Sequence, residues 1–285
     1  PRTSVRTRRI VSFLIVVLAL VAAWESYKVI GKALDGTFPF SDQPLPVRPD
    51  DRTMPHTWDI IWALFQPVRR GGELLIVNLT KASLFTLSEA LLGFVFGGLF
   101  GFALGVLFVR SQLAERAFMP YVVGSQTIPI IAIAPMVVVW GARLGLGQIF
   151  QIAIIAAYIT FFPVVINTLR GLRSPEPTAT ELMRSYAASD RAMLWKLQVP
   201  AAMPYIFTAL KVSATACVVG AIIGELPTGS RNGLGRALLE FSQQFGARPE
   251  KLYAAVLMSA VAGILFVGAI TLIEFKLVQS RRRPV

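Results

Sequence analysis

The segment that decides the fold is Glu181–Pro204, with the sequence ELMRSYAASDRAMLWKLQVPAAMP. It is polar and lies between two strongly apolar stretches, in a chain whose residues are 54% hydrophobic. Glu181 is expected to begin a short helix, small residues follow at 187–189, and a Val-Pro pair ending at Pro200 is expected to stop it. A polar island between apolar helices predicts a contact surface on one side of a membrane.

The composition predicts an all-α polytopic membrane protein. The chain has 285 residues, a mean hydropathy of +0.61 and only 15% charged residues, whereas a soluble domain carries about 25%. Several apolar stretches approach or exceed the roughly 20 residues that a helix needs to cross a bilayer. The short alternating strands of a membrane barrel are not evident in the sequence.

The net charge of +12 is explained by membrane topology rather than by nucleic acid. Four arginines at positions 2, 6, 8 and 9 precede the first apolar run, three at 281–283 follow the last, and other basic residues cluster in alternate loops. This distribution is the positive-inside pattern. It predicts a multi-pass membrane protein, embedded in lipid, with both termini in the cytosol and no nucleic-acid partner; its location in the inner membrane is implied by the family resemblance described below.

We expect six transmembrane helices, at about residues 10–30, 82–109, 118–140, 149–169, 205–224 and 252–278. The predicted organisation is a cytosolic tail and first helix (1–30), a periplasmic connector with an interfacial helix at 57–65 (31–81), a core of five helices (82–279) and a basic tail (280–285). The second helix carries closely spaced glycines at 93, 97, 98, 101 and 105. Such spacing lets another helix approach closely.

The sequence contains no motif for nucleotide binding or catalysis. The Gly-x-x-x-x-Gly-Lys-Ser/Thr phosphate-binding motif does not occur, so any ATP must be bound by another polypeptide. His56 and Cys217 are the only residues of their kinds and cannot build a histidine or cysteine metal site. We therefore expect no enzymatic activity, no metal and no cofactor bound by this chain.

Five residues are candidates for a translocation path. Glu89 is predicted about two turns into the second helix from the outer side, where a membrane-embedded charge calls for a functional hypothesis. Gln126, Thr127 and Pro129 lie in the third helix, where proline bends a helix and frees a carbonyl. Glu225 follows the fifth helix, at the expected outer mouth. The alternative interpretations are a kinked packing helix at 126–129 and a purely structural turn after Glu225.

The segment 181–200 resembles the EAA loop of ABC-importer permeases, the coupling helix that docks into a cytosolic ATPase. The matching positions are Glu181, Ala187, Val199 and Pro200; the family usually has glycine at the second of these. Residues 182–183 are Leu-Met where two alanines are usual. The resemblance extends over residues 57–278 and implies the type I ABC-importer permease fold. We call residues 176–204 the coupling segment.

Two further motifs resemble the nitrate/taurine/sulfonate branch of these permeases. The first is Pro-x-x-Ala-x-x-Pro at 129–135 with Trp-Gly at 140–141, and the second is Glu225 followed by Gly-Leu-Gly at 233–235. The resemblance implies a subunit that takes a small polar solute from a binding protein and moves it by alternating access. The solute class would be nitrate, taurine or sulfonate, or a pyrimidine or thiamine precursor, which the sequence at 225–229 favours. A stand-alone secondary transporter or channel is the alternative, although such proteins often show inverted repeats.

The resemblance also implies partners and a set of coupling residues. The implied partners are two cytosolic ATPase subunits that bind ATP and Mg, a second copy of this permease or a related permease, and a periplasmic or lipid-anchored binding protein. Small residues would let the coupling segment seat in a cleft, apolar residues would anchor it, and charged residues would orient it. The implied ATPase-coupling residues are Glu181, Arg184, Ala187, Ala188, Ser189, Arg191, Met193, Leu194, Trp195 and Pro200.

Overall fold

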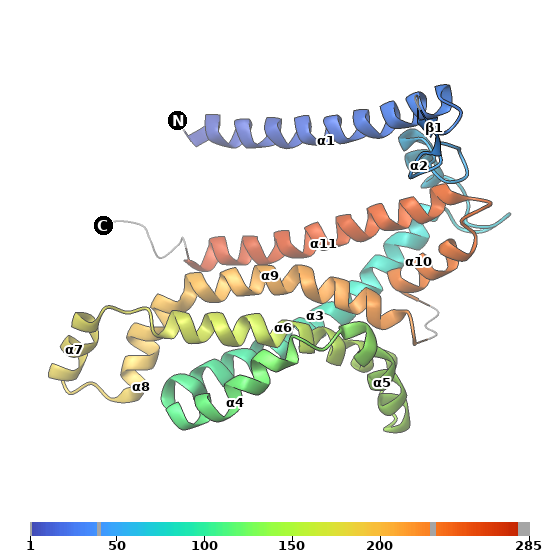
Figure 1. Ribbon diagram of the computed structural model, residues 1–285. Helices are drawn as coiled ribbons and strands as arrows, with labels where there is room; N and C mark the ends of the chain where they lie inside the picture. Colours follow the sequence, from blue (N-terminus) through green and yellow to red (C-terminus); the bar gives the residue numbers. More distant parts are fainter. Residues whose placement is uncertain (1, 39–40, 229–231, 279–285) are drawn as a thin grey trace. The chain divides into compact units, whose positions relative to one another are not determined.

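The computed structural model describes residues 2–38, 41–228 and 232–278, and the predicted basic tail at 280–285 lies outside them. The described chain is almost entirely helical, as predicted (Figure 1). Its elements are α1 (Arg2–Ala33), β1 (Thr37–Phe38), β2 (Ser41–Pro44), α2 (Thr57–Ala63), α3 (Leu75–Arg110), α4 (Gln112–Ser125), α5 (Ile130–Arg143), α6 (Gln148–Leu172), α7 (Pro177–Ser185), α8 (Asp190–Met193), a π-helical turn (Leu194–Gln198), α9 (Val199–Glu225), α10 (Leu234–Gln243) and α11 (Pro249–Val278). Strands β1 and β2 pair antiparallel.

Five helical runs of the described chain are long and apolar enough to cross a membrane, and a sixth span forms if the bent pair α4–α5 is counted as one. The expectation of one kinked helix at 118–140 is wrong, because the chain bends by 100° between α4 and α5. Pro129 is the N-cap of α5 with an extended backbone. Proline disfavours the helical conformation in the residue before it and supplies no N–H, so the chain breaks here rather than kinks.

The described chain divides into two compact units, one formed by the described residues of 2–79 and 237–257 and the other by those of 80–236 and 258–278. In the first unit, ion pairs and hydrogen bonds tie the end of α1 to the connector. The ammonium of the buried Lys28 lies 2.7 Å from the Asp51 carboxylate, and that of Lys32 lies 3.0 Å from it. Glu25 accepts hydrogen bonds of 2.8 Å from both the backbone N–H and the hydroxyl of Thr57. The connector is therefore ordered against the first helix.

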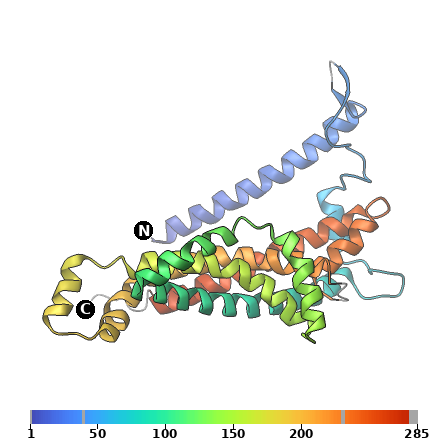
Figure 2. The ribbon, with the colours of Figure 1, turned by 60° about the horizontal axis from the view of Figure 1, so that its bottom comes forward.

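The second unit is built around α6, which packs between α3 and α9 (Figures 1 and 2). Every fourth residue of α3 from 93 to 105 is a glycine that lies against α6. A Cβ atom at Gly97 would lie 2.5 Å from the carbonyl oxygen of Ala157, and one at Gly101 would lie 2.6 Å from that of Phe161. The prediction that the glycine spacing admits a close helix neighbour is confirmed, with Gly98 the exception because it faces away from α6.

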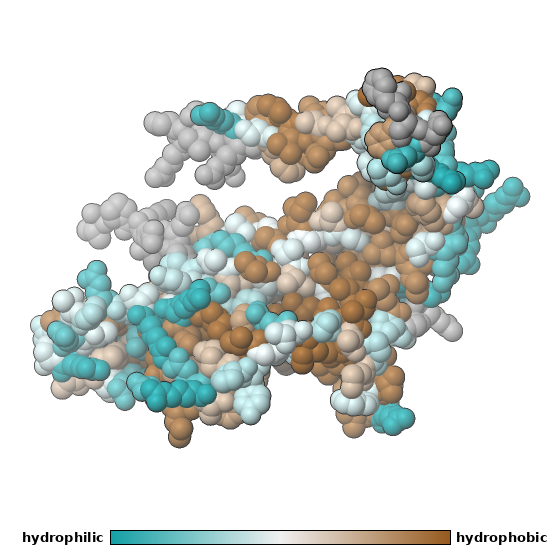
Figure 3. Space-filling model, in the orientation of Figure 1, coloured by the Kyte–Doolittle hydropathy of each residue, from teal (hydrophilic) through white to brown (hydrophobic). Residues whose placement is uncertain are grey.

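The exposed surface of the described helices is apolar where a bilayer would contact it. Phe13, Leu14, Ile15 and Leu18 are all exposed on the middle of α1, and apolar side chains cover that stretch in Figure 3. The end of the second unit that carries α7 and α8 is polar in the same view. The predicted helix at 57–65 forms as α2, with two exposed tryptophans; its place along a membrane surface stays a prediction.

The glycine contacts predict that only one of two neighbouring alanine substitutions is destabilising. Gly97→Ala forces α3 away from α6, since the new methyl group meets backbone atoms that cannot rotate aside. We expect it to destabilise the purified protein by about 1–3 kcal/mol. Gly98→Ala is the matched control, because its methyl group meets only Leu210 at 3.7 Å. Thermal unfolding in detergent should show a lower Tm for the first variant only; equal values would contradict the packing.

Candidate functional site

The coupling segment connects α6 to α9 and contains two short helices. Helix α7 begins with proline at its first position, where the missing N–H costs nothing. Helix α8 is capped by Ser189, whose hydroxyl accepts a hydrogen bond of 3.3 Å from the N–H of Ala192. These local signals fix a helix–turn–helix form for the segment, whose first part, residues 176–189, lies between two candidate membrane spans.

The small residues 187–189 were expected within a helix, but they form the turn between α7 and α8 and the cap of α8. Ala187 has a φ of +49°, in the left-handed region that disfavours residues with a Cβ atom. Its N–H bonds to the carbonyl of Arg184 at 2.8 Å, which closes the turn. The backbone therefore explains why glycine suits this position better than alanine.

The expectation that Val199 and Pro200 stop the helix is wrong. A π-helical turn at residues 194–198 leads directly into α9, so the run from Asp190 to Glu225 is one continuous span. Pro200 lies in the first turn of α9. A π turn shifts the local hydrogen-bonding register, and here it comes just before Pro200, which has no N–H to donate. The coupling segment is therefore in direct helical continuity with a membrane helix.

The side chains of the coupling segment divide into those that face outward and one that faces inward. Glu181, Arg184, Ala187, Ser189, Arg191, Trp195 and Pro200 are exposed, and Ala188 and Met193 are half-buried. Leu194 is buried and packs with Leu172, Ala202 and Ile206. It holds the segment to its own permease instead of presenting an apolar surface outward. Two outward-facing residues that the sequence reasoning missed are Leu182 and Tyr186, whose exposed fractions are 57% and 78%.

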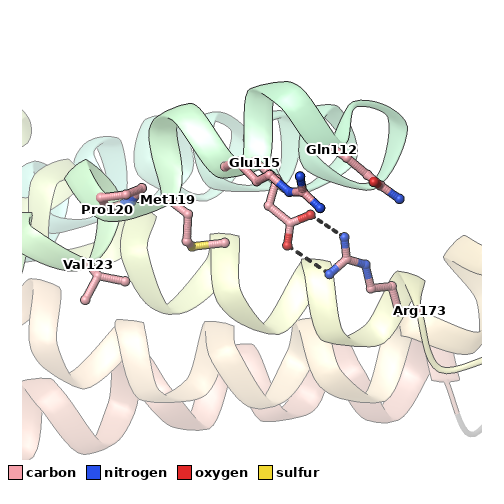
Figure 4. A pocket seen from close by; sticks show the side chains of 7 residues that line it. Gln112, Glu115, Met119, Pro120, Val123 and Arg173 are labelled. Atoms are coloured by element: carbon pink, nitrogen blue, oxygen red, sulfur yellow. Dashed lines mark hydrogen bonds and ion pairs between the residues drawn. The ribbon is translucent and has the colours of Figure 1, made fainter.

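One ion pair lies just before the coupling segment, and one hydrogen bond holds the start of α8 to the end of α3. Arg173, just after α6, donates two hydrogen bonds of 2.9 and 2.5 Å to the Glu115 carboxylate on α4. Both side chains line a groove of about 820 Å³ (Figure 4). The Glu115 carboxylate raises the pKa of Arg173. Arg110, at the end of α3, donates to the backbone carbonyl of Asp190 at 2.6 Å. The sequence reasoning missed these partners, although charged residues at the ends of apolar helices are a usable signal.

Glu89 and Glu225, two of the predicted path residues, lie together in the interior of the second unit. Helix α3 begins seven residues earlier than expected, so Glu89 lies about four turns into it rather than two. Its side chain is fully buried, its oxygens make no well-formed hydrogen bond within the described chain, and it interacts with Glu225 and Gln148. The structure therefore brings together two carboxyl groups that are distant in sequence.

The Glu225 carboxyl group fills a cradle formed by the glycine-rich turn that follows it. It accepts hydrogen bonds of 2.5 Å from the Thr86 hydroxyl and from the N–H of Gly235. A Cβ atom at Gly233, which has a φ of +103°, would lie 2.4 Å from the carboxyl carbon of Glu225. The same Thr86 hydroxyl accepts a hydrogen bond from the N–H of Leu234 at 2.8 Å. The side chains of Glu225 and Thr86 thus accept hydrogen bonds from the first N–H groups of α10, and the glycines leave room for the carboxyl group.

Gln126, Thr127 and Pro129 are not part of this pair. They lie in the exposed break between α4 and α5, where the Thr127 hydroxyl donates to the carbonyl of Gly124 at 2.8 Å. None of these three residues is among the described interaction partners of the two buried glutamates. Their role in lining a path stays a prediction.

The strained turn predicts a stabilising substitution in the coupling segment. Ala187→Gly removes the Cβ atom from a left-handed residue and should stabilise the protein by about 1 kcal/mol. Ala188→Gly is the control, because residue 188 does not have a positive φ and gains nothing from the change. Thermal unfolding of the two variants checks this, and an unchanged or lower Tm for the first would contradict the geometry.

The cradle predicts unequal effects for the two buried glutamates. Glu225→Gln places an amide where Thr86 and Gly235 both require an acceptor, and should lower the stability by about 1–3 kcal/mol. Glu89→Gln breaks no well-formed hydrogen bond, and it removes one of two neighbouring acidic groups. It should therefore lower the stability by less than Glu225→Gln does. Chemical unfolding of both variants tests the order; an equal loss would show that the cradle does not distinguish them.

Comparisons of the sequence with known proteins identify related transport permeases. Residues 93–279 match the family described as binding-protein-dependent transport system inner membrane component. The chain is 31% identical over 212 residues to the formylaminopyrimidine transport permease protein ThiX of Halalkalibacterium halodurans, covering 73% of this chain and 82% of that protein. It is 30% identical to the putative aliphatic sulfonates transport permease protein SsuC of Bacillus subtilis, covering 68% and 67%.

A solved structure shares the fold. A chain of the inward-facing MetNI methionine ABC transporter superposes with a TM-score of 0.58 at 17% identity, covering 74% of this chain and 100% of that chain. Other relatives include taurine and nitrate permeases. The family matched by residues 93–279, together with these relatives, shows that the chain belongs to the inner-membrane permeases of binding-protein-dependent ABC importers, in their nitrate/taurine/sulfonate branch.

Proposed function

We propose that the coupling segment is the surface through which a cytosolic ATPase drives this importer permease. The observation that carries the proposal is that Tyr186 and Trp195 are both exposed on a polar segment whose second helix continues into α9. Aromatic residues of this kind often dominate the energy of protein interfaces. Around them, Glu181, Arg184 and Arg191 supply charges that orient a docking partner.

The complete importer in this proposal contains two ATPase subunits, a binding protein and two permeases. The second permease is a copy of this chain or a related one. ATP and Mg are bound by the ATPases, and this chain binds no cofactor. With six spans, both termini and the coupling segment lie in the cytosol, as the positive-inside pattern supports.

We propose a small, polar, nitrogen-containing solute of the pyrimidine type. ThiX, at 31% identity, is named for formylaminopyrimidine transport. In the described part of the second unit, the fully buried charged residues are the two glutamates Glu89 and Glu225, and no arginine is buried. Acidic surroundings disfavour a sulfonate or nitrate ion and suit a solute that donates hydrogen bonds. Uptake assays with labelled pyrimidine, taurine and nitrate would distinguish these classes.

Removing the two aromatic side chains should release the ATPase. We expect the double variant Tyr186→Ala/Trp195→Ala to retain about tenfold less ATPase on co-purification, or even less. Truncating an aromatic side chain at an interface commonly costs about 1–2 kcal/mol or more of binding free energy, and about 1.4 kcal/mol lowers the affinity tenfold. The matched control is Tyr121→Ala/Trp140→Ala, which removes exposed aromatics of the same kinds from α4 and α5. Equal retention by both folded variants would contradict the assignment of the docking surface.

A further inference from the structure

A basic groove lies in the first unit, between the loop at residues 67–70 and the turn that joins α10 to α11. It has a volume of about 470 Å³ and brings Arg69, Arg70, Arg248 and Lys251 to one place. The coupling segment follows α6, and the chain crosses the membrane once more, through α9, before it reaches the α10–α11 turn. With α9 as a membrane span, the chain topology assigns the groove and the coupling segment to opposite sides of the membrane.

The groove has one wall that is held in place by a buried lysine. Val68 pairs across a tight turn, its N–H donating to the carbonyl of Glu73 at 2.9 Å, and Gly71 supplies the positive φ of that turn. The Lys251 side chain on α11 is buried and donates from Nζ to the carbonyl of Val68 at 2.6 Å. The loop that carries the arginines is thus fixed to α11 before any partner binds.

The groove carries more positive charge than its own carboxylates neutralise. Arg69 pairs with Glu240 at 2.8 Å. Arg70 and Arg248 are exposed, and neither forms a salt bridge with a carboxylate in the described part of the chain. Guanidinium groups bind carboxylates through two parallel hydrogen bonds. Two arginines on either side of one groove are therefore suited to a surface that presents several carboxylates.

We propose that this groove is a docking site for an acidic surface of the solute-binding protein. The inference rests on the proposed function, because it names the place on the permease where that partner binds. The groove is open, and its lining residues except Lys251 lie outside the candidate membrane spans, so charge can both steer the partner and set its register. An anionic lipid headgroup fits less well, since anionic lipid potential acts mainly at the cytoplasmic leaflet.

Charge reversal in the groove tests the proposal. The probe is the binding protein that stimulates ATP hydrolysis by the wild-type complex, with the complex held in nanodiscs of zwitterionic lipid. Arg70→Glu/Arg248→Glu should weaken its affinity at least tenfold at low ionic strength, and added salt should narrow the difference from wild type. Arg52→Glu/Arg143→Glu is the control, because it makes the same charge change at exposed positions outside the groove and should leave the affinity unchanged.

The outcomes separate this inference from the proposed function. Unchanged affinity in the groove variant, with normal binding to wild type, overturns the docking site and leaves the importer function standing. Failure of every candidate binding protein to bind the wild-type complex overturns both. Native mass spectrometry shows whether anionic phospholipid co-purifies with each variant. If the groove variant loses this lipid while its affinity for the binding protein is unchanged, the proposal is also overturned and the groove is assigned to lipid.

Discussion

The close contact of α6 with α3 and α9 is the constraint on which the second unit depends. Inside a bilayer, burying apolar side chains gives little preference for helix association, so helices associate by close packing of small residues. The glycines of α3 at 93, 97, 101 and 105 let the α3 backbone contact α6 closely. On the other side, Gly220 and Gly224 of α9 contact isoleucine side chains of α6. A larger residue at the tightest of these positions would separate the helices.

This packing gives the coupling segment a mechanical path into the membrane. The segment begins where α6 ends, and it continues through a π turn into α9. Arg110 of α3 donates a hydrogen bond to the carbonyl of Asp190 in its second helix, and the buried Leu194 packs with Leu172 at the end of α6. At the far end of α9, Glu225 binds the first residues of α10. One helical run therefore connects the second helix of the coupling segment to the buried carboxyl pair, and in the proposed function this run would carry a movement of the segment along α9.

Much of this arrangement could be predicted from sequence, because its signals are local. Apolar stretches gave the spans, glycine spacing gave the close face of α3, and the pattern from Glu181 to Pro200 located the coupling segment. Proline was the ambiguous residue. Pro129 breaks a helix that was expected to kink, whereas Pro200 lies within a helical run that was expected to stop there. The outcome at a proline depends on what satisfies the neighbouring carbonyls. The pairing of Glu225 with Thr86, 139 residues earlier, has no local signal at all.

The central claim is that a separate ATPase moves this permease through the coupling segment. The most direct test is solute uptake into liposomes that contain the purified permease, with and without its ATPase, binding protein and ATP. We predict uptake only with all components present, and its loss in the Tyr186→Ala/Trp195→Ala variant while the protein stays folded. Uptake by the permease alone would contradict the account and identify a stand-alone transporter.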